Sequence, residues 1–139
     1  EPFSFHEKEY RATCLTVGNP HCIIFSDKVS EAAVRELGPY VENADEFPHR
    51  MNLQLCKRID RGNLDIEIWE RGSGYTKASG TGSCAAAIAA YRLGYVESRV
   101  NVNQPGGMIQ IDIKEDGTIY MTGSVGFVAD MSVAGSFFS

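Results

Sequence analysis

One stretch of the sequence, residues 83–93, constrains the fold more than any other. It reads SCAAAIAAYRL and is apolar on nearly every face of a helix. A helix that is hydrophobic all round has to be enclosed by other elements, and small alanines let those elements approach closely. Gly94 follows the last helical position and can end the helix in the left-handed conformation. The sequence therefore predicts one buried helix at the centre of the fold.

The rest of the chain reads mainly as strands joined by hairpin turns. Residues 51–59 and 63–70 alternate in period two around the turn 60–62, which predicts a hairpin with one buried face. A short amphipathic helix is predicted at 30–39, with Ser30 as its cap and Gly38-Pro39 at its end. The other expected strands are 11–18, 21–25, 99–104, 108–114, 119–123 and 127–135. About eight strands and two helices indicate an α+β fold, an antiparallel or mixed, barrel-like sheet wrapped around one buried helix.

Size and charge narrow the classes of partner. With 139 residues the chain is long enough for one domain with a real core. Its net charge of −5 argues against nucleic acid or an anionic membrane as a partner. No apolar run approaches the roughly 20 residues that cross a bilayer. The start, EPFSFHEKEY, lacks the basic and apolar regions of a signal peptide, and the absence of an initial Met fits a fragment or a processed product.

The cysteines and histidines give no metal or disulfide signature. Cys14, Cys22, Cys56 and Cys84 form no C-x-x-C pair, and a chain of this size needs no disulfide framework. Reduced thiols are typical of a cytoplasmic protein. His21 beside Cys22 is the one conceivable start of a metal site, and no second pair with ligand spacing follows it. We therefore predict a cytoplasmic protein without a bound metal.

The stretch SGTG, residues 79–82, places bare main chain directly before the apolar helix. Gly80 and Gly82 carry no side chain that would shield the backbone N–H groups. Free donors at the positive end of a helix favour an anion such as a carboxylate or a phosphate. A tight strand-to-helix turn without any ligand explains the same residues and is the commoner use of a single Gly-rich turn. A dinucleotide site is excluded, because no acidic residue ends the next strand and the flanking hairpins are not βαβ units.

Polar residues near this turn suggest a site without proving one. Glu70 and Arg71 end a strand just upstream, where Arg could clamp a carboxylate and Glu could hold an ammonium group or move a proton. A surface ion pair is the plainer interpretation. Asn19 and His21 are expected in a turn between strands, free to face a cleft, although a single His is more often structural. His49, Arg50 and Asn52 fit a loop and a strand start equally well; the sequence of this part is FPHRMN.

Together, four motifs resemble one family. GNPH, FPHRMN, ERGSGYTKASGTGSCA and PGG, in this order, look like the C-terminal half of diaminopimelate epimerase, a cofactor-independent amino acid epimerase, from about residue 16 to residue 123. The resemblance implies a lobe in which a barrel of strands surrounds a central helix. In the family, two such lobes face each other across a cleft, and each lobe contributes one cysteine to the site.

The resemblance also assigns roles to individual residues. It implies substrate contacts for six positions: Asn19, Asn52, Glu70, Arg71, and the backbone of Gly80 and Thr81. It associates His21 and Glu70 with acid–base chemistry. The implied reaction converts the LL form of diaminopimelate to the meso form, in lysine and peptidoglycan precursor synthesis, by proton transfer at Cα between two groups on opposite faces. Neither a metal nor another cofactor is implied, and the partner is an amino acid.

Ser79 departs from the family pattern. The family motif reads Ala-Cys-Gly-Thr-Gly, whereas this chain has Ala-Ser-Gly-Thr-Gly at 78–82, so Ser79 stands at the catalytic cysteine's position. A thiol with a reference pKa near ~8.5 can be tuned toward neutrality, and a serine hydroxyl cannot be without strong help. Cys84, in the first turn of the predicted helix, is not expected to replace it.

We expect the lobe alone to be inactive, with the N-terminal lobe in the same or another chain; a homodimer is also conceivable. Three explanations of Ser79 stay open: an engineered substitution, a divergent isomerase of the same fold, or a catalytically silent relative. A carboxylate-binding module that does no chemistry is the alternative of a different class.

Overall fold

The computed structural model describes residues 2–5, 8–17, 19–43, 51–123 and 126–132 of the chain. Within these ranges it contains ten strands and two helices. The strands are β1 (Pro2–Phe5), β2 (Lys8–Val17), β3 (Asn19–Phe25), β4 (Asn52–Asp60), β5 (Asn63–Glu70), β6 (Gly74–Thr76), β7 (Arg99–Gln104), β8 (Gly107–Ile113), β9 (Thr118–Gly123) and β10 (Gly126–Ser132). The helices are α1 (Glu31–Asn43) and α2 (Gly80–Arg92).

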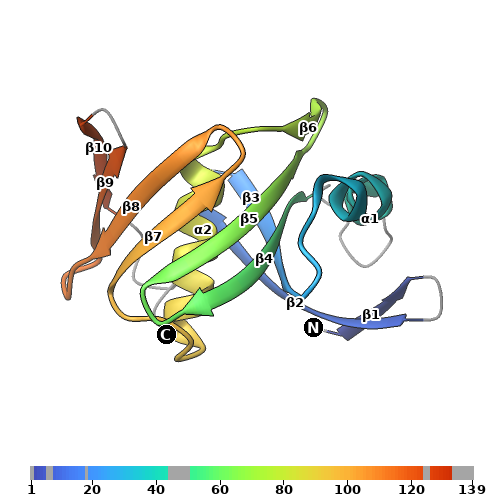
Figure 1. The fold of residues 1–139 in the computed structure, drawn as a ribbon, viewed down its shortest axis with the longest axis horizontal. Coiled ribbons are helices and arrows are strands. Elements are labelled where there is room, and N and C mark those ends of the chain that lie inside the picture. The colour runs from blue at the N-terminus through green and yellow to red at the C-terminus, as the bar shows by residue number, and fades with distance from the viewer. Residues whose placement is uncertain (1, 6–7, 18, 44–50, 124–125, 133–139) are drawn as a thin grey trace.

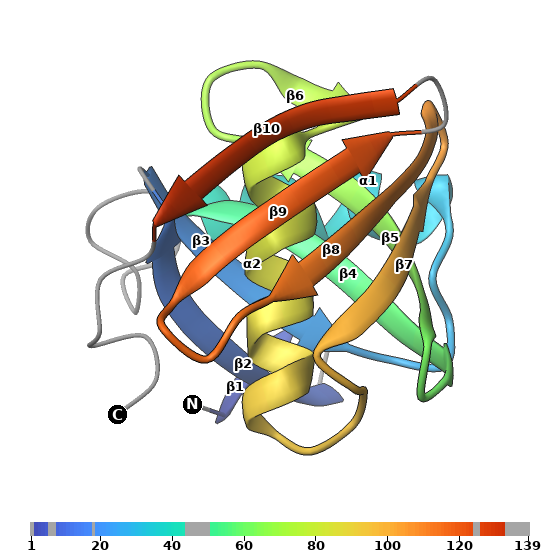
Figure 2. The same ribbon diagram turned by 90° about the vertical axis from the view of Figure 1, so that its left-hand side faces the viewer.

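The strands form one mixed sheet that curves around α2. Its order is β1-β2-β3-β4-β5-β7-β8-β9-β10, and the short β6 pairs with β5 off this path. Neighbours run antiparallel except for two parallel pairs, β3 with β4 and β5 with β7. In Figure 2 strands β8 to β10 lie in front of α2 and strands β2 to β4 behind it. The predicted fold class is confirmed; β1 and β6 are the strands that sequence reasoning had not anticipated.

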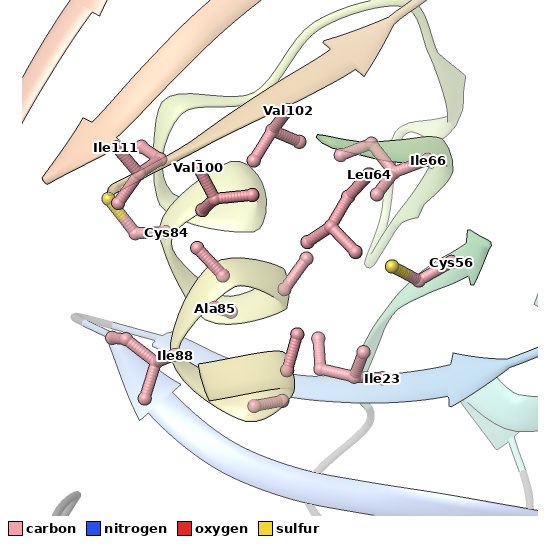
Figure 3. Close-up of a cluster of buried hydrophobic side chains, with 14 of the residues drawn as sticks. Ile23, Cys56, Leu64, Ile66, Cys84, Ala85, Ile88, Val100, Val102 and Ile111 are labelled. Carbon is pink, nitrogen blue, oxygen red and sulfur yellow. The ribbon is translucent and has the colours of Figure 1, made fainter. Parts of the chain in front are cut away.

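Helix α2 is enclosed as its apolar sequence predicts. Every residue from Gly82 to Ala90 is buried. Strand side chains such as Ile23, Leu64, Val100 and Ile111 point at the helix from several directions (Figure 3). Gly94 ends the helix with φ +79°, and the N–H of Tyr95 reaches back to the Ala90 carbonyl at 2.9 Å. This is the left-handed glycine cap expected from the sequence.

Helix α1 runs further than predicted. Ser30 caps it as expected, since its Oγ accepts a hydrogen bond from the Ala33 N–H at 3.1 Å. Gly38-Pro39 does not end it, however, and Pro39 lies inside a helix that continues to Asn43. The last turns are retained because Leu37 and Val41 are buried against the outer face of the sheet. Figure 1 shows α1 on the side of the sheet away from α2.

Strand β4 is buried on both faces at its start, which corrects the prediction of one buried face. Residues 51–56 are all buried. Leu53 and Leu55 belong to the apolar cluster under α1, whereas Cys56 belongs to the cluster around α2. The polar residues Asn52 and Gln54 share the α2 side with Cys56, because side chains alternate along a strand.

Gly38 is required by the close approach of Trp69 rather than by a helix end. A Cβ at this position would lie 2.2 Å from Trp69 Cγ. We expect Gly38→Ala to lower the unfolding free energy by about 1–3 kcal/mol, because overpacking outweighs the up to ~1 kcal/mol that Ala gains in a helix. Urea denaturation measures this. Gly62→Ala is the matched control, since its Cβ would meet its nearest neighbour, Asp60 Oδ1, at 3.6 Å; an equal loss in both variants would contradict the prediction.

Candidate active site

Four elements bring the predicted site residues to one end of the sheet. These elements are the start of β3, the start of β4, the end of β5 and the N-terminus of α2. His21 is the register partner of Asn52 in the parallel pair. Asn52 in turn accepts a hydrogen bond from the Arg71 backbone N–H at 2.6 Å. His49, Arg50 and Gly18 lie outside the described residues, so the structure does not bear on their predicted roles.

Ser79 is the N-cap of α2, and the SGTG stretch is largely helix rather than loop. Ser79 has extended backbone angles, φ −152° and ψ 119°, and its Oγ accepts a hydrogen bond from the Gly82 N–H at 2.9 Å. The Ser83 N–H bonds the Ser79 carbonyl at 3.0 Å. In the part of the chain that the structure describes, the first-turn N–H groups of Gly80 and Thr81 have no partner. These two donors lie at the positive end of a helix, where backbone N–H groups suit an anion, and the binding of a ligand by Gly80 and Thr81 stays a prediction.

Two glycines of the first turn serve different purposes. A Cβ at Gly80 would meet only Met121, at 3.7 Å and 3.8 Å, which is ordinary contact. A Cβ at Gly82 would lie 2.8 Å from Gln54 Nε2 and 3.0 Å from Ser79 Oγ. Protein packing therefore requires Gly82 and does not require Gly80. Packing thus explains Gly82 without a ligand, and the role of Gly80 as an opening for a ligand stays a prediction.

The turn between β7 and β8 supports this end of α2. The Gly106 N–H donates to the Lys77 carbonyl at 2.7 Å, and a Cβ at Gly106 would lie 3.0 Å from that of Ala78. From the end of β7, Gln104 Oε1 accepts from the Ser79 N–H at 3.0 Å and the Ser83 hydroxyl at 3.2 Å. The PGG motif and Gln104 thus hold the cap in place.

His21 lies in strand β3 and not in a turn, which corrects the sequence prediction. His21 is 1% exposed, because β3 begins at Asn19 and places His21 inside the sheet, opposite Asn52 of the neighbouring β4. Its Nδ1 lies 3.0 Å from Gln54 Oε1, and its Nε2 lies 2.9 Å from Asn19 Oδ1. Burial lowers the pKa of His21 to about 4, opposed by the hydrogen bond with Gln54 and assisted by the charge of Arg71. The ring is therefore neutral near pH 7.

Asn52 and Glu42 fasten the strand end that carries Glu70 and Arg71. Asn52 is 2% exposed, and its Nδ2 donates to the Pro20 carbonyl at 3.0 Å. The buried Glu42 accepts from Trp69 Nε1 at 2.9 Å and from the Gly72 N–H at 3.1 Å. Glu70 is half-buried and Arg71 is exposed. Asn52 thus positions this loop, and any contact it makes with a ligand stays a prediction.

Gln54, Gln104 and Glu42 were missed by sequence reasoning. Gln54 is a polar residue amid apolar neighbours on a strand, and that signal could have identified it. Gln104 and Glu42 give no such signal, because their partners lie far away in the sequence. Cys84 is fully buried in the core cluster, and burial raises its pKa to about 12. It is no substitute for a cysteine at position 79.

The described residues contain neither a metal-binding cluster nor a membrane-spanning helix. No group of three or more His, Cys, Asp or Glu side chains there could hold a metal ion. Neither described helix is long and apolar enough to span a membrane. None of the four cysteines forms a disulfide.

A lobe in which a curved sheet surrounds a buried helix defines a class of fold. Crystal structures of phenazine biosynthesis proteins of the PhzF family share this fold. Those from Enterococcus faecalis and Bacillus anthracis each superpose with a TM-score of 0.57, at 16% and 15% identity. The matches cover 75% and 82% of this chain and 37% and 38% of those proteins.

Within this class, the sequence decides the family. The diaminopimelate epimerase family model matches residues 13–128, and the chain belongs to this family. It is 50% identical over 110 residues to diaminopimelate epimerase 2 of Nostoc sp., covering 79% of this chain and 39% of that protein. It is 40% identical over 125 residues to diaminopimelate epimerase of Bacillus cytotoxicus, covering 88% and 43%. The chain thus spans about two fifths of the length of these relatives.

The lowered pKa of His21 predicts a pH dependence of stability. The unfolded chain takes up this proton near pH 6.5 and the folded chain only near pH 4, so the unfolded state binds more protons between these values. Folding stability should therefore fall as the pH drops from 6.5 to 4, by about 3 kcal/mol for a shift of this size. Denaturation at several pH values measures how the free energy of unfolding changes with pH. His21→Gln should flatten this dependence in this window, and an unchanged slope in that variant would contradict the prediction.

Proposed function

We propose that this chain, residues 1–139, is one lobe of a cofactor-independent isomerase that interconverts the LL and meso forms of diaminopimelate. The observation that carries the proposal is the N-terminus of α2, where Gly80 and Thr81 offer two backbone donors. Arg71 adds a positive charge at a strand end that converges on the same region. These groups suit the carboxylate of an amino acid. Membership of the family supports the same class of ligand.

The chemistry requires stabilisation of a carbanion. A Cα–H is a very weak acid, and its removal leaves negative charge that spreads into the neighbouring carboxylate. Helix N-terminal donors aimed at that carboxylate stabilise the charge as it develops. Two acid–base groups on opposite faces then exchange the proton and invert the centre. In this proposal Ser79 stands at one of the two positions, where its hydroxyl does not exchange the proton as a cysteine thiol would, and Glu70 and His21 assist at the same site. The side chains of Asn19, Asn52, Glu70 and Arg71 hold the ligand.

The second acid–base group belongs to a lobe outside these residues. The length of the relatives supports a two-lobe protein, because this chain matches only about two fifths of each. In this proposal the N-terminal lobe belongs to the same chain or to another chain. The protein could also form a homodimer. Four cysteines without a disulfide fit a reducing compartment such as the cytoplasm.

One observation favours a second candidate, a binding module without chemistry. Ser79 Oγ is occupied as the cap of α2, where it accepts from the Gly82 N–H at 2.9 Å. Its hydroxyl has no base beside it among the described contacts that would lower its pKa. A lobe with this cap would still bind a carboxylate through Gly80 and Thr81 while leaving Cα untouched.

Ligand binding tests the part that both candidates share. Calorimetry with meso-diaminopimelate should show binding to the unaltered protein. Arg71→Ala should weaken that binding by about 1.5–3 kcal/mol, the size of one charge-assisted contact, with a smaller effect on stability. Arg99→Ala is the matched control, because this exposed arginine pairs with Asp112 at 3.2 Å on the surface of the sheet. Unchanged affinity together with a large fall in melting temperature would instead identify Arg71 as a structural ion-pair residue.

A further inference from the structure

Gln54 is a buried polar residue whose amide nitrogen lacks a hydrogen-bond partner among the described residues. It lies in β4 on the side that faces α2 and is 0% exposed. Its Oε1 lies 3.0 Å from His21 Nδ1. Its Nε2 finds no hydrogen-bond partner among the described residues. A buried amide N–H without an acceptor is costly, so this arrangement calls for an explanation.

The neutral ring of His21 limits what its two neighbours can be. A neutral imidazole has one N–H donor and one acceptor nitrogen. Both ring nitrogens face carboxamide oxygens, Gln54 Oε1 on one side and Asn19 Oδ1 at 2.9 Å on the other. A ring with a single proton cannot donate to both. One of the two carboxamides therefore has to present its NH2 group, which a half-turn of the amide plane brings about.

The N-terminus of α2 indicates that the carboxamide of Gln54, rather than that of Asn19, is the one that turns. The end of Gln54 that carries Nε2 lies 2.8 Å from the place of a Cβ on Gly82, in the first turn of α2. The N-terminus of a helix is positive and favours an oxygen over an NH2 group. A half-turn of Gln54 puts the oxygen there, and it also gives the NH2 group an acceptor at His21 Nδ1. One rotation gives the NH2 group an acceptor and matches the helix dipole.

The orientation of Gln54 determines that of Asn19, because His21 contacts both side chains. With Nδ1 as acceptor, His21 carries its proton on Nε2 and donates it to Asn19 Oδ1. Asn19 then keeps its oxygen on the ring and its NH2 group turned away from it. No described residue accepts from that NH2 group. Asn19 is half-buried at the start of β3, at the end of the sheet where the candidate site lies.

We propose that Gln54 is a positioning residue that sets the tautomer of His21 and, through it, orients Asn19 as a hydrogen-bond donor. The ligand part of this inference rests on the proposed function: the Asn19 NH2 group donates to an acceptor oxygen of the amino acid, such as a carboxylate oxygen. His21 assists in this arrangement as a fixed link between Gln54 and Asn19. The site thereby prefers ligands that present an acceptor at this point.

Nitrogen NMR of the histidine rings tests the inference without any activity. In the chain labelled with ¹⁵N-histidine, the His21 resonances are assigned with a His21→Gln variant. The expected result near pH 7 is a neutral ring protonated at Nε2. Gln54→Glu replaces the NH2 group by an oxygen that only accepts, so the His21 proton should move from Nε2 to Nδ1, and Nε2 should then accept from the Asn19 NH2 group. Gln110→Glu is the control, because it makes the same change of charge beside Asn101 in the sheet and should leave His21 unaltered.

Binding of meso-diaminopimelate gives the second readout. Gln54→Glu should weaken binding roughly tenfold or more, the size of one lost charge-assisted hydrogen bond, while Gln110→Glu should not. A ring protonated at Nδ1 in the unaltered chain would overturn the inference, as would a His21 tautomer that Gln54→Glu leaves unchanged. Unchanged affinity in Gln54→Glu would overturn the role of Asn19 orientation in binding. If the unaltered protein binds no diaminopimelate, the proposed function fails, and the tautomer still decides the role of Gln54.

Discussion

Replacing Ser79 by cysteine is expected to raise the rate of inversion at Cα by about 10²–10⁴-fold in the two-lobe protein, the contribution typical of one general acid–base group. The unaltered protein should bind its substrate and fail to invert it. A cysteine or other base on the opposite lobe could still remove the proton from one stereoisomer. We therefore expect slow exchange of the Cα hydrogen for deuterium without inversion when Ser79 is present.

The cap geometry explains why a thiol would work at this position. Ser79 Oγ accepts from the Gly82 N–H at 2.9 Å, at the positive end of a thirteen-residue helix. A cysteine sulfur in the same place would meet the same donor and the same dipole, and both favour the thiolate. The pKa of that thiol should fall from its reference near ~8.5 toward the working pH. The far less acidic serine hydroxyl gains too little from the same surroundings.

Proton exchange in D2O, followed by NMR beside an epimerisation assay, measures both rates. Ser79 and Ser79→Cys proteins are compared with both lobes present. Cys84→Ser in the Ser79→Cys background should change little, because Cys84 is fully buried in the core. Equal inversion by the Ser79 and Ser79→Cys proteins would contradict the argument. It would mean that the hydroxyl, or another group, is sufficient.

The sequence was a good guide to the centre of the fold. Helix α2 could be predicted because an all-apolar helix has a single solution, enclosure, and Gly94 has few uses after a helix except as a left-handed cap. The β4–β5 and β7–β8 hairpins followed from alternation and turn residues. These features depend on residues close together in the sequence, where pattern and structure are directly linked.

Tertiary packing decided the features that the sequence did not reveal. Helix α1 passes Pro39 because Leu37 and Val41 gain more from burial than the chain loses at one proline. Gly38 looked like a helix end, whereas it makes room for Trp69. Asn19 and His21 looked like turn residues, and β3 takes both into the sheet. Each of these outcomes depends on an element that is distant in the sequence.

The same limit applies to the site. Glu70, Arg71 and the SGTG stretch lie close together in the chain, so their shared location was predictable. The partners that hold the site, Gln54 on His21 and Gln104 on Ser79, lie 33 and 25 residues away from the groups they contact. Motif reasoning finds residues that touch a ligand more readily than residues that orient them.

Replacing Gly80 by alanine is expected to abolish most ligand binding and leave the fold intact. The new Cβ would meet only Met121, at 3.7 Å and 3.8 Å, so packing tolerates it. Alanine is also a better helix former than glycine, by about 1 kcal/mol in a helix interior and less at a terminus. The Cα–Cβ bond of a helical residue tilts toward the N-terminus. The methyl group therefore stands where a carboxylate would approach the backbone donors.

Gly82→Ala is the contrasting variant, because it adds the same methyl group two residues further on. There the Cβ would lie 2.8 Å from Gln54 Nε2 and 3.0 Å from Ser79 Oγ, so the cap and the Gln54 amide must shift. We expect a loss of about 1–3 kcal/mol of stability from this overpacking. Calorimetric titration with meso-diaminopimelate, beside thermal unfolding of both variants, separates the two effects. Gly80→Ala should bind at least roughly tenfold more weakly at undiminished melting temperature, a factor that corresponds to about 1.4 kcal/mol. If Gly80→Ala binds as tightly as the unaltered protein, the ligand does not approach the first turn of α2, and the carboxylate position proposed there is wrong.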